Sequence, residues 1–288
     1  MLEEKLMRFA AEHDCIAGIC EASPLEEERK RLLAAQTPFV SRNIDKRISP
    51  RMSLPKAKSV IVFGKAYTPS PFKNLSSLAY GLDYHIRLRD ILQKLAHLLD
   101  CAAVVMVDSG PLAERAFAVK AGLGFWGRNG MVISPLLGSF FNIGLLLVDI
   151  ALRPSNHEQI ISCPKDCRLC LDACPSGALK PYSVKASTCI SYLTQKKIDL
   201  TEEKEEKSES KLLAMAQQLY GCDLCQISCP FNARAILPTS QIDPTDILAM
   251  DEATFETRFA HTAMAWRGLQ HLQRNAKIVL NKQYSKGK

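Results

Sequence analysis

The sequence predicts an α/β (α+β) N-terminal domain, a cysteine-rich second domain and a short helical tail. Strand-like apolar runs alternate with helical patterns over residues 1–152, which is typical of a sheet covered by helices. Eight cysteines then crowd into the stretch from Cys163 to Cys229. The remainder is helical in pattern and rich in basic residues. We therefore place the domain boundaries at 1–152, 153–238 and 239–288.

The first domain contains helix and strand patterns in turn. Apolar residues at a spacing of three to four predict helices, and short β-branched runs predict buried strands. The run SVIVFGKA at Ser59–Ala66 predicts a central strand. The other predicted strands are Cys15–Cys20, Ala102–Val107, Met131–Ser134 and Phe140–Ile150. The predicted helices are about Leu2–His13, Leu25–Gln36, Leu82–Leu99 and Pro111–Ala121.

The composition is that of a globular protein, with 47% apolar and 23% charged residues among 288. No apolar run is long enough for a membrane-spanning helix, so we expect no membrane contact. The first residues show neither an apolar signal core nor twin arginines, which favours a cytoplasmic protein. Thiols there stay reduced, so a disulfide scaffold is a poor explanation of 11 cysteines. Cys15, Cys20 and Cys101 are predicted core residues.

The eight remaining cysteines form two related motifs. The first reads C-x3-C-x2-C-x3-C-P from Cys163 to Pro175, and the second reads C-x2-C-x3-C-P from Cys222 to Pro230. This spacing is typical of two-cluster ferredoxins, in which the cysteine before proline ligates the other cluster. The crossed arrangement uses every cysteine of the stretch. It assigns one cluster to Cys163, Cys167, Cys170 and Cys229, and the other to Cys174, Cys189, Cys222 and Cys225.

Two features of this stretch leave alternatives open. The spacer between Cys163 and Cys167 has three residues where two are usual, so Cys163 is the least regular ligand. A zinc site or purely structural cysteines would be the alternative, although zinc motifs usually show two separated ligand pairs.

Asp108 follows a predicted strand and precedes a predicted helix. Its carboxylate would either face a cleft or cap the helix, and the sequence favours neither. Gly122–Gly127 matches G-x-G-x-x-G, but it follows a helix and opens a strand, which excludes a dinucleotide site. These glycines are expected to admit a large flat ligand or a neighbouring element.

Five segments together resemble the cobalamin-dependent epoxyqueuosine reductases of tRNA modification. The resemblance covers about residues 40 to 280, with the motifs in the family's order. The segments are VDSGPLAERAFAVKAGLGFWGRNG, YGLDYHIRLRDIL, CRLCLDACPSGAL, CISYLT and YGCDLCQISCPFN.

The resemblance implies a cobalamin-binding domain of nitroreductase-like fold, followed by a ferredoxin-like module with two [4Fe-4S] clusters. The implied reaction removes the epoxide oxygen of epoxyqueuosine at the tRNA wobble position, with electrons from an external donor such as a flavodoxin or ferredoxin. Asp108 matches the family's proton donor, and we expect burial against the corrin to raise its pKa. The residues expected to line the cobalamin site are Arg47, His85, Ser109, Arg128, Asn129 and Met131, with Ser191 and Asp223 from the cluster domain.

The sequence departs from the family pattern at two further places. Asn129 stands where the family often has histidine. The chain also ends at Lys288, where typical members continue into helical repeats, so a short form lacking these repeats is expected. The resemblance implies tRNA as the partner but leaves its recognition open.

Two other functions fit part of the sequence. A corrinoid iron-sulfur reductase like the reductive dehalogenases shares the cofactor plan but usually carries a twin-arginine signal. A two-cluster electron carrier without cobalamin would leave the first domain unexplained.

The net charge of +7 is concentrated at one end of the chain. Residues 261–288 contain no Asp or Glu and include Arg267, Arg274, Lys277, Lys282, Lys286 and Lys288. This tail is the candidate for contact with tRNA phosphates, and a solvated, frayed helix end is the alternative.

Overall fold

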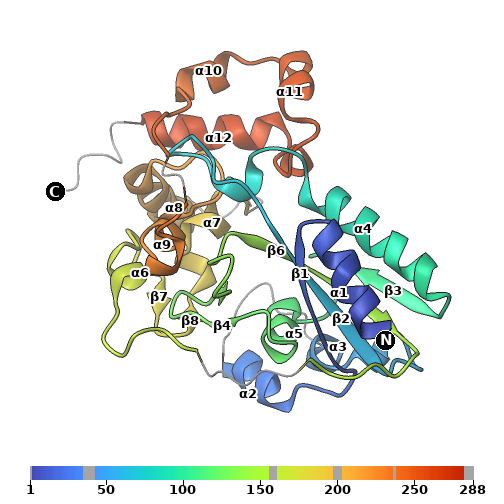
Figure 1. Cartoon of the computed structure of the whole chain (residues 1–288). Helices are drawn as coiled ribbons and strands as arrows, with labels where there is room; N and C mark the ends of the chain where they lie inside the picture. The colour runs from blue at the N-terminus through green and yellow to red at the C-terminus, as the bar shows by residue number, and fades with distance from the viewer. Residues whose placement is uncertain (1, 35–42, 156–160, 197–202, 236–237, 282–288) are drawn as a thin grey trace. The chain divides into compact units, whose positions relative to one another are not determined.

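The computed structural model describes residues 2–34, 43–155, 161–196, 203–235 and 238–281 (Figure 1). The chain forms two compact units. The first combines Met1–Tyr67 with Tyr84–Cys167, and the second combines Thr68–Asp83 with Arg168–Lys288. The segment 68–83 therefore belongs to the second unit, although it connects a strand and a helix that both belong to the first unit.

A four-stranded antiparallel sheet organises the first unit, in the order β1-β2-β6-β3. The strands are β1 (Cys15–Glu21), β2 (Ser59–Ala66), β3 (Ala103–Met106) and β6 (Phe141–Val148). The prediction of a central strand at Ser59–Ala66 is confirmed. The prediction of a buried strand at 102–107 is only partly right, because β3 lies at the edge of the sheet and Met106 is its one buried residue.

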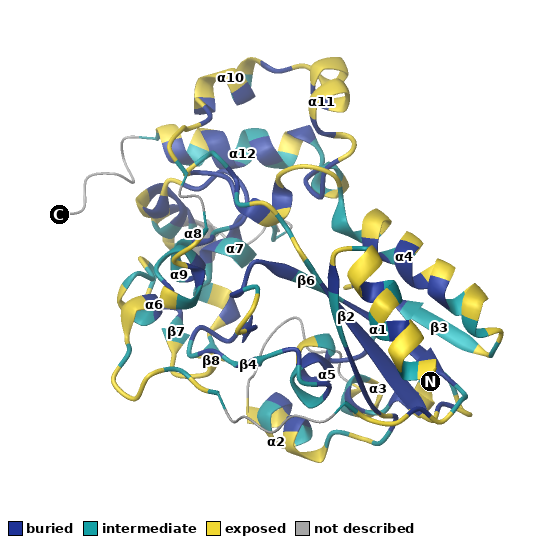
Figure 2. Cartoon of the chain, in the orientation of Figure 1, coloured by how far each residue is buried: buried dark blue, intermediate teal, exposed yellow. Residues whose placement is uncertain are grey.

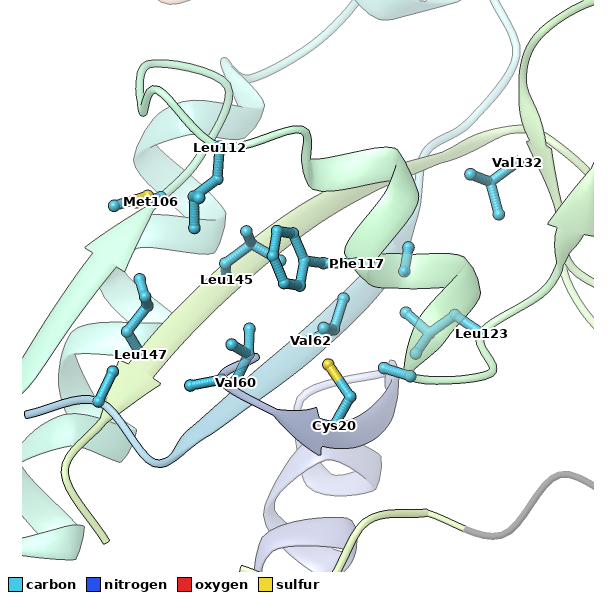
Figure 3. Packing of buried hydrophobic residues seen from close by; sticks show 14 of the residues in the cluster. Cys20, Val60, Val62, Met106, Leu112, Phe117, Leu123, Val132, Leu145 and Leu147 are labelled. Carbon is cyan, nitrogen blue, oxygen red and sulfur yellow. The ribbon is translucent and has the colours of Figure 1, made fainter. Parts of the chain in front are cut away.

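The two interior strands bury both of their faces, because successive side chains of a strand point in opposite directions. Val60 and Val62 of β2 join one apolar cluster, whereas Ile61 and Phe63 join another. Figure 3 shows the first cluster, in which Phe117 lies over these strands. The sheet is thus covered by helices on both sides, as the mixed α/β prediction required.

Different helices cover the two faces. Helix α5 (Glu114–Lys120) supplies Phe117 to one cluster, and α1 (Leu2–Glu12) and α4 (Tyr84–Leu99) pack on the other. Figure 2 shows buried and exposed sides alternating along α4. The other elements of this unit are α2 (Glu26–Ala34), α3 (Ile44–Ile48), the 3-10 helix η1 (Pro50–Met52), β4 (Phe125–Trp126) and β5 (Val132–Ile133).

The predicted core cysteines lie in the first unit. Cys15 and Cys20 are buried, and Cys101 is half-buried against the same core. Burial raises the pKa of Cys20 to about 12, so this thiol stays neutral. The prediction of core packing is therefore confirmed for Cys15 and Cys20.

The second unit is built around α12 (Leu269–Leu280). Its apolar residues Leu269, Leu272 and Ala276 are buried at helical spacing in a cluster with residues of α10 and α11. The expected alternative of a solvated, frayed helix end is thus wrong for 269–280. The basic residues Lys282, Lys286 and Lys288 lie outside the described residues.

The other elements of the second unit are short. They are η2 (Ser77–Ala79), α6 (Leu169–Asp172), β7 (Leu179–Lys180), β8 (Ser183–Val184), η3 (Ala186–Thr188), α7 (Ile190–Leu193), α8 (Glu203–Ala216), α9 (Leu224–Ile227), η4 (Pro230–Asn232), α10 (Pro244–Ala249), α11 (Glu252–Phe259) and η5 (Ala265–Arg267). None of the helices in the described ranges has the length and apolar character needed to cross a bilayer.

Truncation of Leu146 should show how much the sheet core stabilises the first unit. Leu146 is fully buried, so Leu146→Ala is expected to lower the free energy of unfolding by about 2–5 kcal/mol through lost burial and a cavity. Urea unfolding measures this change. Leu136→Ala, at a side chain that is 80% exposed, is the control and should change stability by less than about 0.5 kcal/mol. Equal effects of the two substitutions would contradict the assigned core.

Candidate functional site

Asp108 lies on the loop that connects β3 to α5. Its backbone has a φ of 52°, a left-handed conformation that non-glycine residues adopt rarely, although aspartate tolerates it. Its side chain is 66% exposed. Backbone strain of this kind is concentrated at functional sites.

Two aromatic side chains at the start of α4 face the Asp108 carboxylate. The Tyr84 hydroxyl donates a hydrogen bond to Asp108 Oδ2 at 2.6 Å, and His85 Nε2 lies 3.8 Å from the same oxygen. The Tyr84 and His85 rings stack with centroids 4.0 Å apart. The structure thus brings together Asp108 and His85, which the sequence predicted, and adds Tyr84, which it did not.

The Asp108 side chain does not cap the helix that follows. Helix α5 begins at Glu114, and its N-cap residue Ala113 makes no side-chain capping bond. The capping interpretation of Asp108 is therefore wrong, because the helix starts three residues later than Pro111.

Glu114 binds the backbone of the Asp108 loop. Its Oε1 accepts a hydrogen bond from the Asp108 backbone N–H at 2.7 Å. Burial, together with the nearby Asp108 charge, raises the pKa of Glu114 to about 8. Glu114 is therefore a neutral acid at pH 7. Sequence reasoning missed it, and its position in the first turn of the helix after Asp108 was the available signal.

The pKa of Asp108 is lowered in this structure. Desolvation by burial raises it, but the nearby His85 side chain, the hydrogen bond from Tyr84 and the charges of His85 and Arg115 favour the carboxylate more strongly. The rise in pKa that we expect from burial against a corrin stays a prediction, because the chain by itself favours the charged form.

The glycine-rich turn after α5 lets two short strands approach each other closely. A Cβ on Gly124 would lie 2.2 Å from the Ile133 carbonyl oxygen, and one on Gly127 would lie 2.5 Å from Ile133 Cδ1. These glycines are explained by contact with a neighbouring element, which was one of the two expected reasons.

The predicted cobalamin residues 109, 129 and 131 also have local partners. The Asn129 side chain is buried and its Oδ1 accepts from the Met131 N–H at 3.1 Å, which shapes the turn. The Ser109 hydroxyl is exposed and accepts from Arg89 at 3.0 Å.

Two of the predicted arginines carry buried donors. Within the described residues, Nε of Arg47 and Nε of Arg128 have no hydrogen-bond partner. Another nitrogen of Arg128 donates to the Lys165 carbonyl, and burial lowers the pKa of Arg47. Buried donors without acceptors fit a bound group rich in amide and phosphate oxygens, which cobalamin is.

The two cysteine motifs adopt the same local fold in the second unit. Each forms a four-residue helix, α6 or α9, and the carbonyl of the residue before each helix accepts two backbone N–H groups. Cys170 and Cys225 occupy the same place in these helices, and Cys174 and Cys229 follow them. This equivalence agrees with a duplicated ferredoxin core.

Electrostatic interactions connect four thiols of the second unit in pairs. Burial raises the pKa of Cys222 to about 12, and the neighbouring thiols Cys189 and Cys174 add to the rise. Burial, with the neighbouring Cys222 and Cys189, also raises the pKa of Cys225. These four are the predicted ligands of one cluster, and a cluster's positive charge would favour their thiolates.

The remaining predicted site residues lie next to ligands. Asp223 is buried, and both of its carboxylate oxygens accept hydrogen bonds inside the second unit. Ser191 is half-buried, and its carbonyl accepts from Thr194 and Gln195. Cys163 and Cys167 are half-buried at the end of the first unit.

Replacement of Glu114 by glutamine should remove a pH dependence of stability. A raised pKa means that the folded chain holds this proton better than the unfolded chain, so the free energy of unfolding falls as pH rises from about 4.5 to 8. Glu114→Gln cannot titrate, and we expect it to gain at least about 1 kcal/mol over the natural chain between pH 5 and pH 8. Urea unfolding at both pH values measures this difference. The exposed Glu27→Gln is the control, and parallel pH profiles for all three proteins would refute the assignment.

Comparison with known families identifies both parts of the chain. Residues 47–109 match the family model for epoxyqueuosine reductase QueG, and residues 162–232 match the 4Fe-4S double cluster binding domain. The second match spans all eight cysteines of the two motifs, including Cys163.

Individual relatives cover most of the chain. An epoxyqueuosine reductase of Bacillus cereus is 34% identical over 91% of this chain and 75% of its own length. A crystal structure of an epoxyqueuosine reductase with an epoxyqueuosine-modified tRNA-Tyr stem loop has a TM-score of 0.84 and 30% identity, over 97% of this chain and 80% of that one. The Bacillus subtilis enzyme, solved with its catalytic aspartate loop swung out of the active site, has a TM-score of 0.81 and 31% identity over 97% and 81%. The chain therefore belongs to the epoxyqueuosine reductase family of iron-sulfur oxidoreductases.

Proposed function

We propose that the chain reduces epoxyqueuosine at the wobble position of tRNA, with cobalamin in the first unit and Asp108 as proton donor. The observation that carries the proposal is the strained, exposed Asp108 loop held by Tyr84 and Glu114. The Bacillus subtilis relative also has a catalytic aspartate loop, which supports an aspartate in this role.

Removal of the epoxide oxygen requires two electrons and two protons, and Asp108 would give a proton to the departing oxygen. Cobalamin supplies the reducing centre when bound. Arg47 and Arg128 would hold its polar groups through their buried donors, beside His85, Ser109, Asn129 and Met131. The first unit would then be a cobalamin-binding domain of nitroreductase-like fold.

The protonation of Asp108 must change during the reaction, because the chain by itself favours its carboxylate. Its side chain is largely exposed, so a corrin and a substrate packed over it would remove water and raise its pKa. Glu114, neutral at pH 7, would hold the loop by its hydrogen bond with the Asp108 N–H without placing a second negative charge beside Asp108.

The electrons would reach the first domain, residues 1–152, from the two clusters of the second, residues 153–238. A flavodoxin or ferredoxin would reduce these clusters in the cytoplasm, where tRNA is modified. Residues 239–288 would contribute to tRNA binding. There Arg267 stacks on the exposed Trp266, whereas Arg274 donates to the Leu193 carbonyl within the unit.

Asp108→Asn should abolish most turnover while leaving the cofactors bound. The amide cannot donate a proton as an acid does, so we expect the rate to fall at least about 100-fold. The measurement is nucleoside analysis of tRNA from an epoxyqueuosine reductase deletion strain that carries the variant, together with turnover of the purified protein.

Asp90→Asn is the matched control, because Asp90 is exposed on α4 and pairs with Lys94. It should restore queuosine as the natural chain does. Full activity of Asp108→Asn with intact cofactors would remove Asp108 from the mechanism, and failure of the natural chain to convert epoxyqueuosine would overturn the proposed reaction.

Tyr84→Phe should raise the pKa of Asp108. The phenol donates to the carboxylate and so stabilises its charged form, and loss of this bond favours the protonated acid. We expect the alkaline limb of the pH–rate profile to move to higher pH in single-turnover experiments. Tyr182→Phe, at an exposed tyrosine of the second unit, should leave the profile in place. A Tyr84→Phe profile shifted to lower pH would contradict this role.

A further inference from the structure

A buried carboxylate stands between two predicted ligands of one cluster. Asp223 lies between Cys222 and Cys225 in sequence and is only 6% exposed. Its Oδ1 accepts from the Ser76 hydroxyl at 2.8 Å and from Gln226 Nε2 at 3.0 Å, and its Oδ2 accepts from the Ser77 N–H at 2.6 Å. All three partners are donors, which suits an ionised carboxylate.

Two of these donors come from the segment 68–83, far away in sequence. The Ser76 N–H also donates to the Tyr220 carbonyl at 2.8 Å, and the Leu219 N–H donates to the Asn74 carbonyl at 2.8 Å. The Asn74 side chain exchanges two hydrogen bonds with Ile242. The segment is therefore fixed to the chain on both sides of the ligand loop.

Gly221, the residue before Cys222, completes this contact. It has a φ of 67°, and a Cβ here would lie 2.3 Å from Ser76 Cβ. Its N–H donates to Thr194 Oγ1 at 2.8 Å, close in sequence to the predicted ligand Cys189. The backbone that carries Cys222 thus contacts Ser76 of the segment 68–83 on one side and the end of α7 on the other.

The first cysteine motif carries the opposite charge at the equivalent position. Arg168 precedes α6 as Asp223 precedes α9, and each lies between two cysteines of a C-x2-C pair. The Arg168 side chain is 64% exposed and pairs with Asp172 at 3.4 Å. Water screens the charge of Arg168, whereas the buried charge of Asp223 is screened much less.

We propose that Asp223, held by Ser76 and Ser77, positions the Cys222–Cys225 loop and lowers the reduction potential of the cluster on Cys174, Cys189, Cys222 and Cys225. This inference rests on the cluster assignment within the proposed function. A fixed negative charge beside a cluster opposes the addition of an electron, and charge, hydrogen bonding and exposure set cluster potentials. The two clusters would then differ in potential, with the Asp223 side being the more reducing one.

The test uses the full chain with both clusters reconstituted anaerobically. Electron paramagnetic resonance during a redox titration gives the potential of each cluster, and iron and sulfide analysis gives the occupancy. Asp223→Asn removes the charge and also places an amide N–H group against a donor. We expect it to favour reduction of the cluster that includes Cys222 and Cys225 about tenfold, which raises its reduction potential by about 59 mV for a one-electron couple. The potential of the other cluster should stay unchanged.

Ser76→Ala and Arg168→Gln complete the set. Ser76→Ala keeps the charge but loosens the loop, so that cluster should lose iron to a chelator several times faster than in the natural chain. Arg168→Gln, the exposed counterpart, should change neither potential nor iron release. If Asp223→Asn fails to fold, the rate at which Ser76→Ala releases iron to the chelator tests the proposal.

Unchanged potentials in Asp223→Asn, or unchanged iron release in Ser76→Ala, would overturn the proposal. These readouts are independent of the substrate. A chain that shows the shift but fails to reduce epoxyqueuosine would refute the proposed reaction and leave this inference standing.

Discussion

The burial of β2 on both faces is the constraint on which the first unit depends. Its side chains alternate between two apolar clusters, so helices must cover both sides of the sheet. Helix α4 packs on one side and its first residues bring Tyr84 to the loop after β3. The contact between Tyr84 and Asp108 is therefore a consequence of the core as much as of the local sequence.

The two acids of the candidate site show how environment separates chemically similar groups. Asp108 accepts a hydrogen bond from Tyr84 and lies near His85, and both interactions favour its charged form. Glu114 is buried beside that charge and is held neutral. Pairs of carboxyl groups whose pKa values are pushed apart in this way are typical of acid–base sites. The asymmetry also lets Glu114 fix a strained loop without electrostatic repulsion.

Local patterns predicted the elements that local physics determines. The apolar run at Ser59–Ala66 predicted β2 with its exact bounds, and the cysteine spacing predicted a double-cluster domain that the family model matches. The sequence predicts a start of α5 at Pro111, whereas the helix begins three residues later at Glu114. The contact of Glu114 with Asp108 depends on that start and was therefore missed. The bond between Ser76 and Asp223 joins residues 147 positions apart, and no periodicity in the sequence records such a contact.

The placement of the segment 68–83 has a bearing on how the protein is made. During synthesis this segment leaves the ribosome well before residues 219–242, which supply its partners. The β1–β2 pair can form early. The donors of Ser76 and Ser77 in the segment 68–83 stay solvated until the second cysteine motif has been translated. Loop closure over so many residues is slow and costs entropy. The contacts of Ser76 and Ser77 with the Asp223 carboxylate therefore belong to a late stage of folding, after the second cysteine motif has been translated.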